Sequence, residues 1–313
     1  MKRVAFLFPG QGSQAVGMGK AFYDEYADVK KRFQKADQLL GIELTQLMFE
    51  GPKEKLTETE NTQPALLLAG IAVQTLLQKE NIQPVMAAGH SLGEYSALVA
   101  AGALPFEEAL PLVAKRGKLM EEAFPKGKGT MAAVLGMNQS DIEQTLQHLN
   151  ADEVVDIANL NCPGQIVISG SKEGIDNAVA LLKENGAKRV MPLNVSGPFH
   201  SRLMKSANEQ FAKELDHITF DDARIPVYAN VTAEPVTEKS SIKDLLIRQL
   251  YSPVRFEESV RNMLDEKVDA FVELGTGKVL SGLVRKIDRK AKTFAIQDPD
   301  SLNEFLTWYR EES

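Results

Sequence analysis

A serine between two glycines, where a short apolar run meets a stretch of helix-forming residues, constrains the fold of this chain more than any other feature. Residues 89–93 read GHSLG and follow an apolar strand predicted at residues 85–88. Residues 92–101 favour a helix, with Glu94 in its electropositive first turn. In such a sharp strand-to-helix turn, glycines two positions either side of Ser91 relieve backbone crowding, and the hydroxyl projects outward. The pattern predicts a nucleophile elbow; a plain Gly-rich loop is the alternative interpretation.

Composition is typical of a folded globular protein and excludes several classes of function. The 313 residues are 43% hydrophobic and 25% charged, and the net charge of −7 argues against nucleic-acid binding. The single cysteine, Cys162, excludes an internal disulfide and suits a reducing, cytoplasmic location. No Cys and His residues have the spacing of a zinc site, so we expect no metal. The longest apolar stretch, residues 64–77, is too short to cross a membrane, and we expect no membrane segment.

The first third of the chain alternates apolar strands with helices, which predicts a parallel sheet covered by helices. We interpret residues 4–8 as a first strand rather than a signal peptide, because the apolar stretch ends at Pro9 and no cleavage site follows. Helices are predicted at residues 20–39, 64–78 and 107–122.

A different pattern begins after a linker-like segment at residues 124–129. The predicted order is strand, helix, strand, strand, helix, strand at residues 130–135, 140–149, 154–160, 165–169, 172–185 and 188–195, with a capping box at Ser140 and Glu143 opening the first helix. This βαββαβ order predicts a ferredoxin-like unit. Strands then resume at residues 225–231, 270–274 and 293–296. We therefore predict an α/β protein with a large domain of residues 1–127 and 196–313, an inserted small domain of residues 128–195, and a cleft between them.

A nucleophilic serine needs a base, normally a histidine within hydrogen-bond reach. The chain contains four histidines: His90, His148, His200 and His217. His90 adjoins Ser91 and would point to the opposite face, while His148 and His217 lie on predicted solvent-facing helix ends. His200 lies in a turn where the chain re-enters the large domain, so it is the candidate base; a structural histidine is the alternative.

A tetrahedral intermediate also needs donors for its oxyanion, and backbone N–H groups serve best. Leu92, which follows the serine, would supply one donor, and Gln11, in the Gly-rich loop after the first strand, the other. That loop also matches a dinucleotide fingerprint, but residues 41–46 contain no clear second strand ending in an acidic residue. Residues 275–278 (GTGK) lack the remaining positions of a phosphate-binding loop.

Arg116 is a charged residue on a helix face that otherwise reads as buried. It shares a stripe at helical spacing with Val113, Gly117 and Met120. A structural ion pair or a side chain reaching out to water is one interpretation. The other is a bidentate clamp for a substrate carboxylate.

Taken together, six ordered motifs resemble those of the malonyl-CoA:acyl carrier protein transacylases of type II fatty acid synthesis and the related acyltransferase domains of polyketide synthases. The motifs are residues 9–14 (PGQGSQ), 62–65 (TQPA), 89–94 (GHSLGE), 115–117 (KRG), 197–201 (GPFHS) and 249–254 (QLYSPV). The resemblance implies an α/β-hydrolase-like large domain and a ferredoxin-like small domain. It also implies transfer of a malonyl group from malonyl-CoA, through a serine-linked acyl-enzyme, to the pantetheine thiol of acyl carrier protein, with no cofactor.

The resemblance also assigns roles to residues. It implies that Ser91 is the nucleophile, His200 its base and Arg116 the partner of the malonyl carboxylate. Gln11 and Leu92 match the backbone donors of the oxyanion hole. Further matches are Gln249, whose main-chain carbonyl would orient the histidine in place of a triad Asp, and the pocket positions Gln63, Asn159 and Asn161.

Phe199 beside His200 resembles malonyl-selective members of the family, although Pro198 departs from their commoner Ala.

The competing hypotheses are a trans-acting polyketide synthase acyltransferase, a serine esterase or thioesterase, and a non-enzymatic carrier-binding scaffold. Docking of an acidic carrier would need positive charge, and residues 188–189, 285–286 and 289–290 are candidates, with ordinary solvated surface as the alternative. We expect a monomer, because no association helix is evident.

Overall fold

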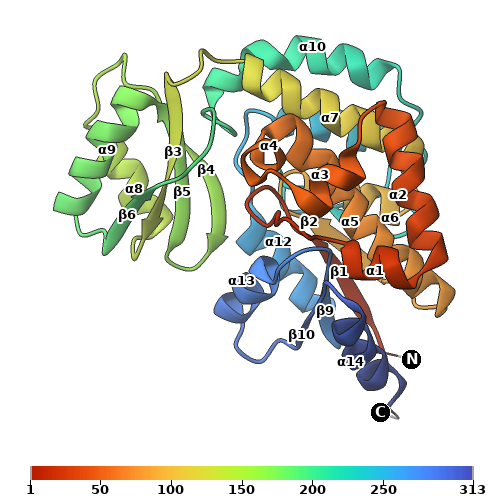
Figure 1. The fold of residues 1–313 in the computed structure, drawn as a ribbon. Coiled ribbons are helices and arrows are strands. Elements are labelled where there is room, and N and C mark those ends of the chain that lie inside the picture. The colour runs from red at the N-terminus through yellow and green to blue at the C-terminus, as the bar shows by residue number, and fades with distance from the viewer. Residues whose placement is uncertain (1, 312–313) are drawn as a thin grey trace.

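The computed structural model describes residues 2–311, and its strands form two separate sheets in that range (Figure 1). The six-stranded sheet has the order β10-β9-β1-β2-β7-β8, and the four-stranded sheet the order β4-β5-β3-β6. The prediction of a mixed α/β fold containing a parallel sheet is confirmed. The strands of the larger sheet are β1 (Val4–Phe8), β2 (Met86–Gly89), β7 (Val227–Tyr228), β8 (Pro235–Val236), β9 (Ala270–Leu274) and β10 (Thr293–Ile296).

The central strand of the larger sheet is β1, whose five apolar residues are all buried. It pairs in parallel with β2 on one side and with β9 on the other. The register sets Phe8 opposite Gly89. Because parallel strands end at the same edge of a sheet, the loop after β1 and the turn after β2 lie side by side. This edge carries both Gln11 and Ser91.

Alternate residues of β1 face two different apolar clusters, as the two-residue period of a strand requires. Val4, Phe6 and Phe8 join a cluster with the helices at residues 27–40, 59–79 and 106–122, whereas Ala5 and Leu7 join one with the helices at residues 256–265 and 279–287. The helices outside the smaller sheet are α1 (Lys20–Glu25), α2 (Ala27–Leu40), α3 (Leu44–Glu50), α4 (Lys53–Thr57), α5 (Thr59–Lys79), α6 (Gly93–Ala100), α7 (Phe106–Glu122), α10 (Lys205–Asp216), α11 (Lys239–Gln249), α12 (Phe256–Asp265), α13 (Val279–Ile287) and α14 (Pro299–Arg310), with a 3₁₀ turn at Arg202–Met204.

The smaller sheet is antiparallel and follows the predicted βαββαβ order. Its elements are β3 (Gly129–Leu135), α8 (Gln139–Leu146), β4 (Val155–Cys162), β5 (Gln165–Ser171), α9 (Lys172–Glu184) and β6 (Arg189–Pro192). Ala132 and Val134 on one face of β3 pack against both helices. Met131 and Ala133 on the opposite face join the apolar cluster of the larger sheet. Figure 1 shows this sheet beside the rest of the molecule, with α8 and α9 on its outer side.

Several predicted boundaries are wrong, for identifiable reasons. The helix predicted at residues 20–39 is split, because Tyr26 is extended and separates α1 from α2. The split lets Tyr23 contact Phe33, with ring centroids 5.7 Å apart, whereas ten residues of straight helix would separate them by about 15 Å. The first helix of the smaller sheet is capped by Asn138, whose side chain accepts from Asp141 N, and not by Ser140. Asn is as good a cap as Ser and lies directly before the first turn.

Two strands are also shorter than predicted. The strand predicted at residues 225–231 is only Val227–Tyr228, because it pairs with β2 over just two residues. The strand predicted at residues 188–195 ends at Pro192, although Leu193 N still donates to Met131 O of β3 at 2.9 Å. No helix in the described range, residues 2–311, has both the length and the apolar character needed to cross a membrane.

Candidate active site

Ser91 occupies a sharp turn between β2 and α6. Its φ of 50° lies in the left-handed region, which a non-glycine residue adopts only when its surroundings hold it there. A Cβ on Gly89 would overlap the backbone of Gly93, and a Cβ on Gly93 would overlap the carbonyl of Phe8. Both glycines are therefore required by close backbone packing. The strained turn fixes the position of Ser91 between β2 and α6.

His200 approaches this hydroxyl from a distant part of the chain. Its Nε2 lies 2.8 Å from Ser91 Oγ, and its Nδ1 lies 2.9 Å from the main-chain carbonyl oxygen of Gln249. Because a carbonyl can only accept, Nδ1 carries the hydrogen and the Nε2 lone pair faces the serine. The geometry allows Nε2 to take the serine proton.

Burial lowers the pKa of His200 to about 3, and the nearby positive charge of Arg116 adds to the effect. His200 is only 4% exposed, so the charged form of its imidazole loses hydration. At neutral pH the ring is therefore neutral and able to accept a proton.

Arg116 is fully buried at the floor of the site. Its Nη1 donates to Gln63 Oε1 at 2.8 Å, and its Nη2 donates to Gln249 Oε1 at 2.9 Å and to Ser91 Oγ at 3.2 Å. The guanidinium lies over the ring of Tyr95, 5.2 Å from its centroid. Burial lowers the pKa of Arg116 from its ordinary value. All its oxygen partners are uncharged groups.

Neither Arg116 nor the nearby Glu94 belongs to an ion pair in the part of the chain that the structure describes. The Nε of Arg116 also lacks a hydrogen-bond partner among residues 2–311. A structural ion pair and a side chain reaching out to water are therefore both excluded for Arg116. The nearby carboxylate of Glu94 contacts Arg116 only through the Gln249 amide, and a buried cation with no direct carboxylate partner favours an anionic ligand.

The loop after β1 passes close to the elbow. A Cβ on Gly10 would overlap the carbonyl of His90, so the two turns touch through their backbones. The Gln11 side chain is turned toward Thr59, with Nε2 3.3 Å from its Oγ1. Leu92 is buried at the start of α6. The backbone amides of Gln11 and Leu92 thus belong to adjacent turns beside Ser91.

These groups meet at a cavity of about 110 Å³ between the two sheets. Of the predicted site residues, it is lined by Gln11, Gln63, Ser91, Leu92, Arg116, Asn159, Phe199 and His200. The remaining wall is His90 with the apolar residues Met120, Met131, Leu193 and Val195. Asn161 and Gln249 do not line it. Asn161 Oδ1 instead lies 2.8 Å from His90 Nε2, and Gln249 is buried behind Arg116 and His200.

His148 and His217 are exposed, as expected. His90 was expected on the face opposite Ser91, but it lines the same cavity, with its Nε2 hydrogen-bonded to Asn161 rather than to the serine. Within residues 2–311, no group of three or more His, Cys, Asp or Glu side chains is arranged to hold a metal ion.

Two residues that sequence reasoning missed complete the site. Asn230 accepts from Ser91 N through Oδ1 at 2.8 Å and donates through Nδ2 to Gly89 O at 2.7 Å, so it supports the elbow from behind. Glu94 is buried, and its Oε2 accepts from Asn230 N and Gln249 Nε2. Burial raises the pKa of Glu94 to about 7. The GHSLGE motif could have indicated Glu94, but no local pattern surrounds Asn230.

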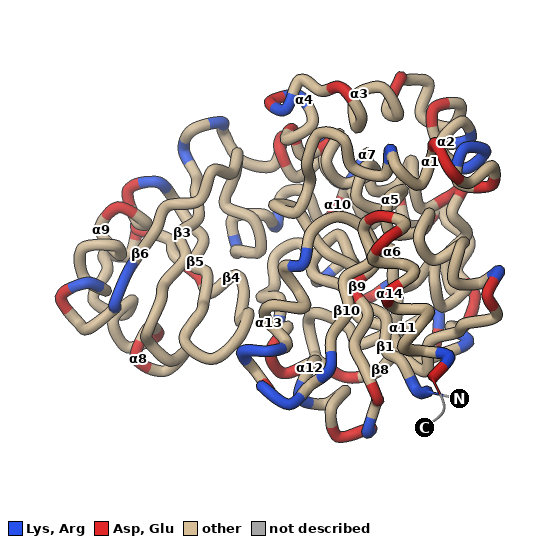
Figure 2. The backbone as a smooth tube through the Cα atoms, turned by 60° about the horizontal axis from the view of Figure 1, so that its bottom comes forward, with Lys and Arg blue, Asp and Glu red and all other residues tan. Residues whose placement is uncertain are grey.

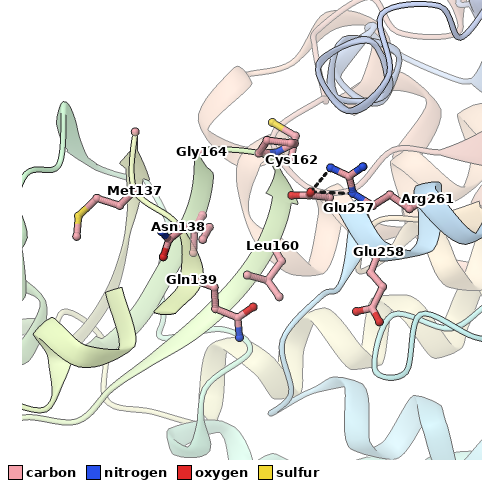
Figure 3. Close-up of a pocket in the computed structure, with 12 residues that line it drawn as sticks. Met137, Asn138, Gln139, Leu160, Cys162, Gly164, Glu257, Glu258 and Arg261 are labelled. Atoms are coloured by element: carbon pink, nitrogen blue, oxygen red, sulfur yellow. Dashed lines mark hydrogen bonds and ion pairs between the residues drawn. The ribbon is translucent and has the colours of Figure 1, made fainter. Parts of the chain in front are cut away.

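A larger hollow of about 660 Å³ lies apart from this cavity and shares no lining residue with it. It opens between the β4–β5 turn and α12, where Glu257 is paired with Arg261 (Figure 3). Cys162 on its wall is buried, which raises the pKa of the thiol. Nothing in this hollow resembles the Ser91–His200 pair.

Comparison with known proteins is consistent with this geometry. The model of the acyl transferase domain family matches residues 5–295. The chain is 52% identical over 314 residues to the malonyl CoA-acyl carrier protein transacylase of Bacillus subtilis, covering 100% of this chain and 99% of the relative. It is similar to the structure of an acyl carrier protein S-malonyltransferase from Vibrio cholerae, with a TM-score of 0.94, 45% identity and coverage of 97% and 99% of the two chains. It is also similar to a malonyl-transacylase solved in complex with a type II polyketide synthase acyl-carrier protein, with a TM-score of 0.95, 40% identity and coverage of 97% and 99%.

Proposed function

Because this chain belongs to the acyl transferase domain family, and within it to the malonyl-CoA:acyl carrier protein transacylases, we propose that Ser91 is the nucleophile of a two-step malonyl transfer. The chain is an acyltransferase that moves a malonyl group from malonyl-CoA to acyl carrier protein. One observation supports these residue assignments. The same small cavity is lined by the Ser91–His200 pair and by Arg116, which has no carboxylate partner among residues 2–311.

In the first step, Ser91 Oγ attacks the thioester carbonyl of malonyl-CoA while His200 Nε2 takes its proton. The new O–C bond forms, the C–S bond breaks, and His200 returns the proton to the departing CoA sulfur. The second step reverses the first with the pantetheine thiol of the carrier. Both ends of the exchange are thioesters, so the reaction is nearly balanced in energy.

Gln249 replaces the acidic member of a Ser-His-Asp triad. Its main-chain carbonyl holds the imidazole tautomer without adding a negative charge next to an anionic substrate. The backbone N–H groups of Gln11 and Leu92 are the proposed donors to the oxyanion of the tetrahedral intermediate.

Arg116 is the proposed partner of the malonyl carboxylate. The guanidinium offers a planar fork of donors, and a carboxylate matches it bidentately. The ligand would take over donors that now face Ser91 Oγ or neutral amide oxygens. Phe199, Gln63 and Asn159 would shape the rest of the pocket, and Asn161 would act indirectly, through His90.

We also propose the finer description of the fold. Residues 1–127 and 196–313 would form an α/β-hydrolase-like domain, which is supported by parallel strands with a serine elbow after β2. Residues 128–195 would form a ferredoxin-like domain, which is supported by the order β4-β5-β3-β6 with two helices packed on one face. The cytoplasmic location stays a prediction that rests on the single cysteine.

The acidic carrier protein would dock on a basic surface patch made of Lys188, Arg189, Arg285, Lys286, Arg289 and Lys290, all of them exposed. Leu135 on β3 pairs with Arg189 on one side and with Gln165 on the other, and Gln165 accepts from Lys286 Nζ at 3.1 Å. The two parts of the patch are therefore at the same end of the smaller sheet. Figure 2 shows Lys and Arg at β6 and at α13.

The test is to incubate the protein with malonyl-CoA in the presence and absence of carrier, and to measure malonyl-carrier and free malonate separately. We expect malonyl-carrier to form rapidly and malonate slowly, and Ser91→Ala to abolish both. Malonate released at the same rate with and without carrier would instead indicate a serine hydrolase.

A further inference from the structure

Glu94 is a buried carboxylate to which the proposed reaction assigns no task. It lies in the first turn of α6, three residues after Ser91, and is 2% exposed. Its Oε2 accepts from two donors, Gln249 Nε2 at 2.7 Å and Asn230 N at 3.0 Å. Hydrogen bonds from a buried amide to a carboxylate are among the stronger ones in proteins. Glu94 is therefore a common anchor for Gln249 and Asn230.

The orientation of the Gln249 amide follows from its neighbours. Arg116 can only donate, so it must face Oε1, which lies 2.9 Å from Nη2. The oxygens around Nε2 are acceptors: Glu94 Oε2 at 2.7 Å, Ser91 O at 3.0 Å and Asn230 Oδ1 at 3.1 Å. A flipped amide would turn its oxygen toward Glu94 and its NH₂ group toward Arg116. The carboxylate and the guanidinium together allow only one orientation.

Both anchored residues hold the strained backbone of Ser91. Asn230 Oδ1 accepts from Ser91 N, and Gln249 Nε2 donates to Ser91 O. Gln249 also accepts from His200 through its main-chain oxygen and from Arg116 through its side chain. The nucleophile, the base and the arginine are thus all connected to Glu94 through one or two hydrogen bonds.

We propose that Glu94 is a positioning residue. Its carboxylate orients Gln249 and Asn230, which hold the Ser91 turn, His200 and Arg116 in the relative positions that malonyl transfer requires. It does not touch the substrate. This inference rests on the proposed function, because the geometry it preserves is that of the malonyl site.

The test compares Glu94→Leu with Glu94→Gln. Leucine removes the acceptor, and we expect kcat/KM for malonyl-CoA to fall by about tenfold to a hundredfold, the usual effect of losing a hydrogen bond to a charged group. The loss should be larger for malonyl-CoA than for acetyl-CoA, because Arg116 loses its alignment. Glutamine can present an oxygen to the same two donors, so E94Q should recover activity to within about threefold of the wild type.

Glu273 offers a matched control. It is equally buried, at 1% exposure, and its carboxylate accepts from Leu280 N and Ser281 N, away from the cavity. Glu273→Leu and Glu273→Gln should lower the thermal midpoint without changing the ratio of malonyl to acetyl transfer. The control separates a loss of fold from a loss of alignment.

The inference is overturned if folded Glu94→Leu keeps the wild-type kcat/KM, or if E94Q is as damaged as Glu94→Leu, since negative charge rather than orientation would then be needed. A wild-type protein that takes up no malonyl group would refute the proposed function instead. In that event a crystal structure of Glu94→Leu still decides the inference, because Gln249 Oε1 either leaves Arg116, as we expect, or stays.

Discussion

The Arg116 guanidinium is a buried cation whose oxygen partners are two neutral amides and one hydroxyl. Removing such a charge from water is costly, and neutral acceptors offset only part of the cost. A carboxylate ligand offsets more. We therefore propose that the substrate carboxylate binds Arg116, and that Arg116 controls which acyl group is accepted.

Replacing Arg116 tests that control. Arg116→Ala should lower kcat/KM for malonyl-CoA by about thirtyfold or more, since truncating one partner of a buried charge pair costs roughly 2–5 kcal/mol. Transfer of the neutral acetyl group should rise, because Ser91 Oγ no longer accepts from Nη2. Arg116→Lys keeps the positive charge but not the planar guanidinium, so its kcat/KM for malonyl-CoA should lie between those of the wild type and Arg116→Ala. Equal losses for both acyl groups would contradict the carboxylate clamp.

The lowered pKa of His200 predicts an unusual pH profile. A histidine of ordinary pKa 6.5 would lose its base form as the pH falls through 6.5, whereas at a pKa of about 3 the base form persists. We expect His200 to contribute no acid limb near pH 6.5 to the profile of kcat/KM for malonyl-CoA. In the complex the substrate carboxylate offsets the charge of Arg116, so the limb of kcat should lie at higher pH than that of kcat/KM.

The measurement should be made on Glu94→Gln, because the pKa of Glu94 is raised to about 7 and its titration would overlap. In that variant, an acid limb of kcat/KM near pH 6.5 would show that His200 keeps an ordinary pKa and would contradict the buried, neutral base.

Individual functional residues could be predicted from the sequence where a short segment of the chain identifies them. Ser91 follows from the elbow pattern, and His200 from its position at the predicted domain junction. Asn230 and the anchoring contacts of Glu94 could not be predicted, because they join residues 136 to 155 positions apart along the chain. Such contacts depend on how α6, β7 and α11 come together, which no local pattern encodes.

Among the elements, the turn between β2 and α6 is held by close backbone contacts. Gly93→Ala would drive a Cβ into the Phe8 carbonyl of the central strand. Neither backbone segment can move easily. We therefore expect the free energy of unfolding to fall by more than the roughly 1–3 kcal/mol typical of overpacking, or the variant not to fold at all.

Gly282 in α13 is the matched control, since a Cβ there meets nothing within 4 Å. Gly282→Ala should stabilise the protein by up to about 1 kcal/mol through helix propensity. Thermal unfolding of both variants is the measurement. A Gly93→Ala protein that melts with the wild type would contradict the close packing of the elbow.

Elements with a strong apolar pattern were predicted well, such as β1 and the helix–strand order of the smaller sheet. Errors occurred where tertiary contacts override a continuous pattern. The break at Tyr26 depends on the Tyr23–Phe33 contact, and the short β7 depends on how far β2 extends beside it. Neither neighbour can be identified from the segment itself.

For the whole molecule, the relation between the two sheets matters most. Met131 and Asn159 from the smaller sheet line the same cavity as Ser91. The site therefore exists only when the two sheets are assembled, and the basic patch lies at one end of the smaller sheet. A monomer stays a prediction.

The basic patch predicts electrostatic docking of the carrier. Reversing Arg189 and Lys286 to Glu should raise KM for the carrier, weaken its salt dependence and leave KM for malonyl-CoA almost unchanged. Lys31 and Lys35 on α2, both exposed and outside the patch, provide a control pair of reversals that should have little effect. Carrier kinetics across a salt series are the measurement. An unchanged carrier KM in the patch variant would mean that docking occurs elsewhere.

We propose that the Ser91 hydroxyl, held by His200 and facing Arg116, carries the malonyl group. The decisive experiment is intact mass spectrometry after brief exposure to malonyl-CoA. The wild type should gain the mass of one malonyl group, located at Ser91 by peptide mapping, and Ser91→Ala should gain none. A malonyl adduct of equal yield on Ser91→Ala, or an adduct mapped to another residue, would contradict the account.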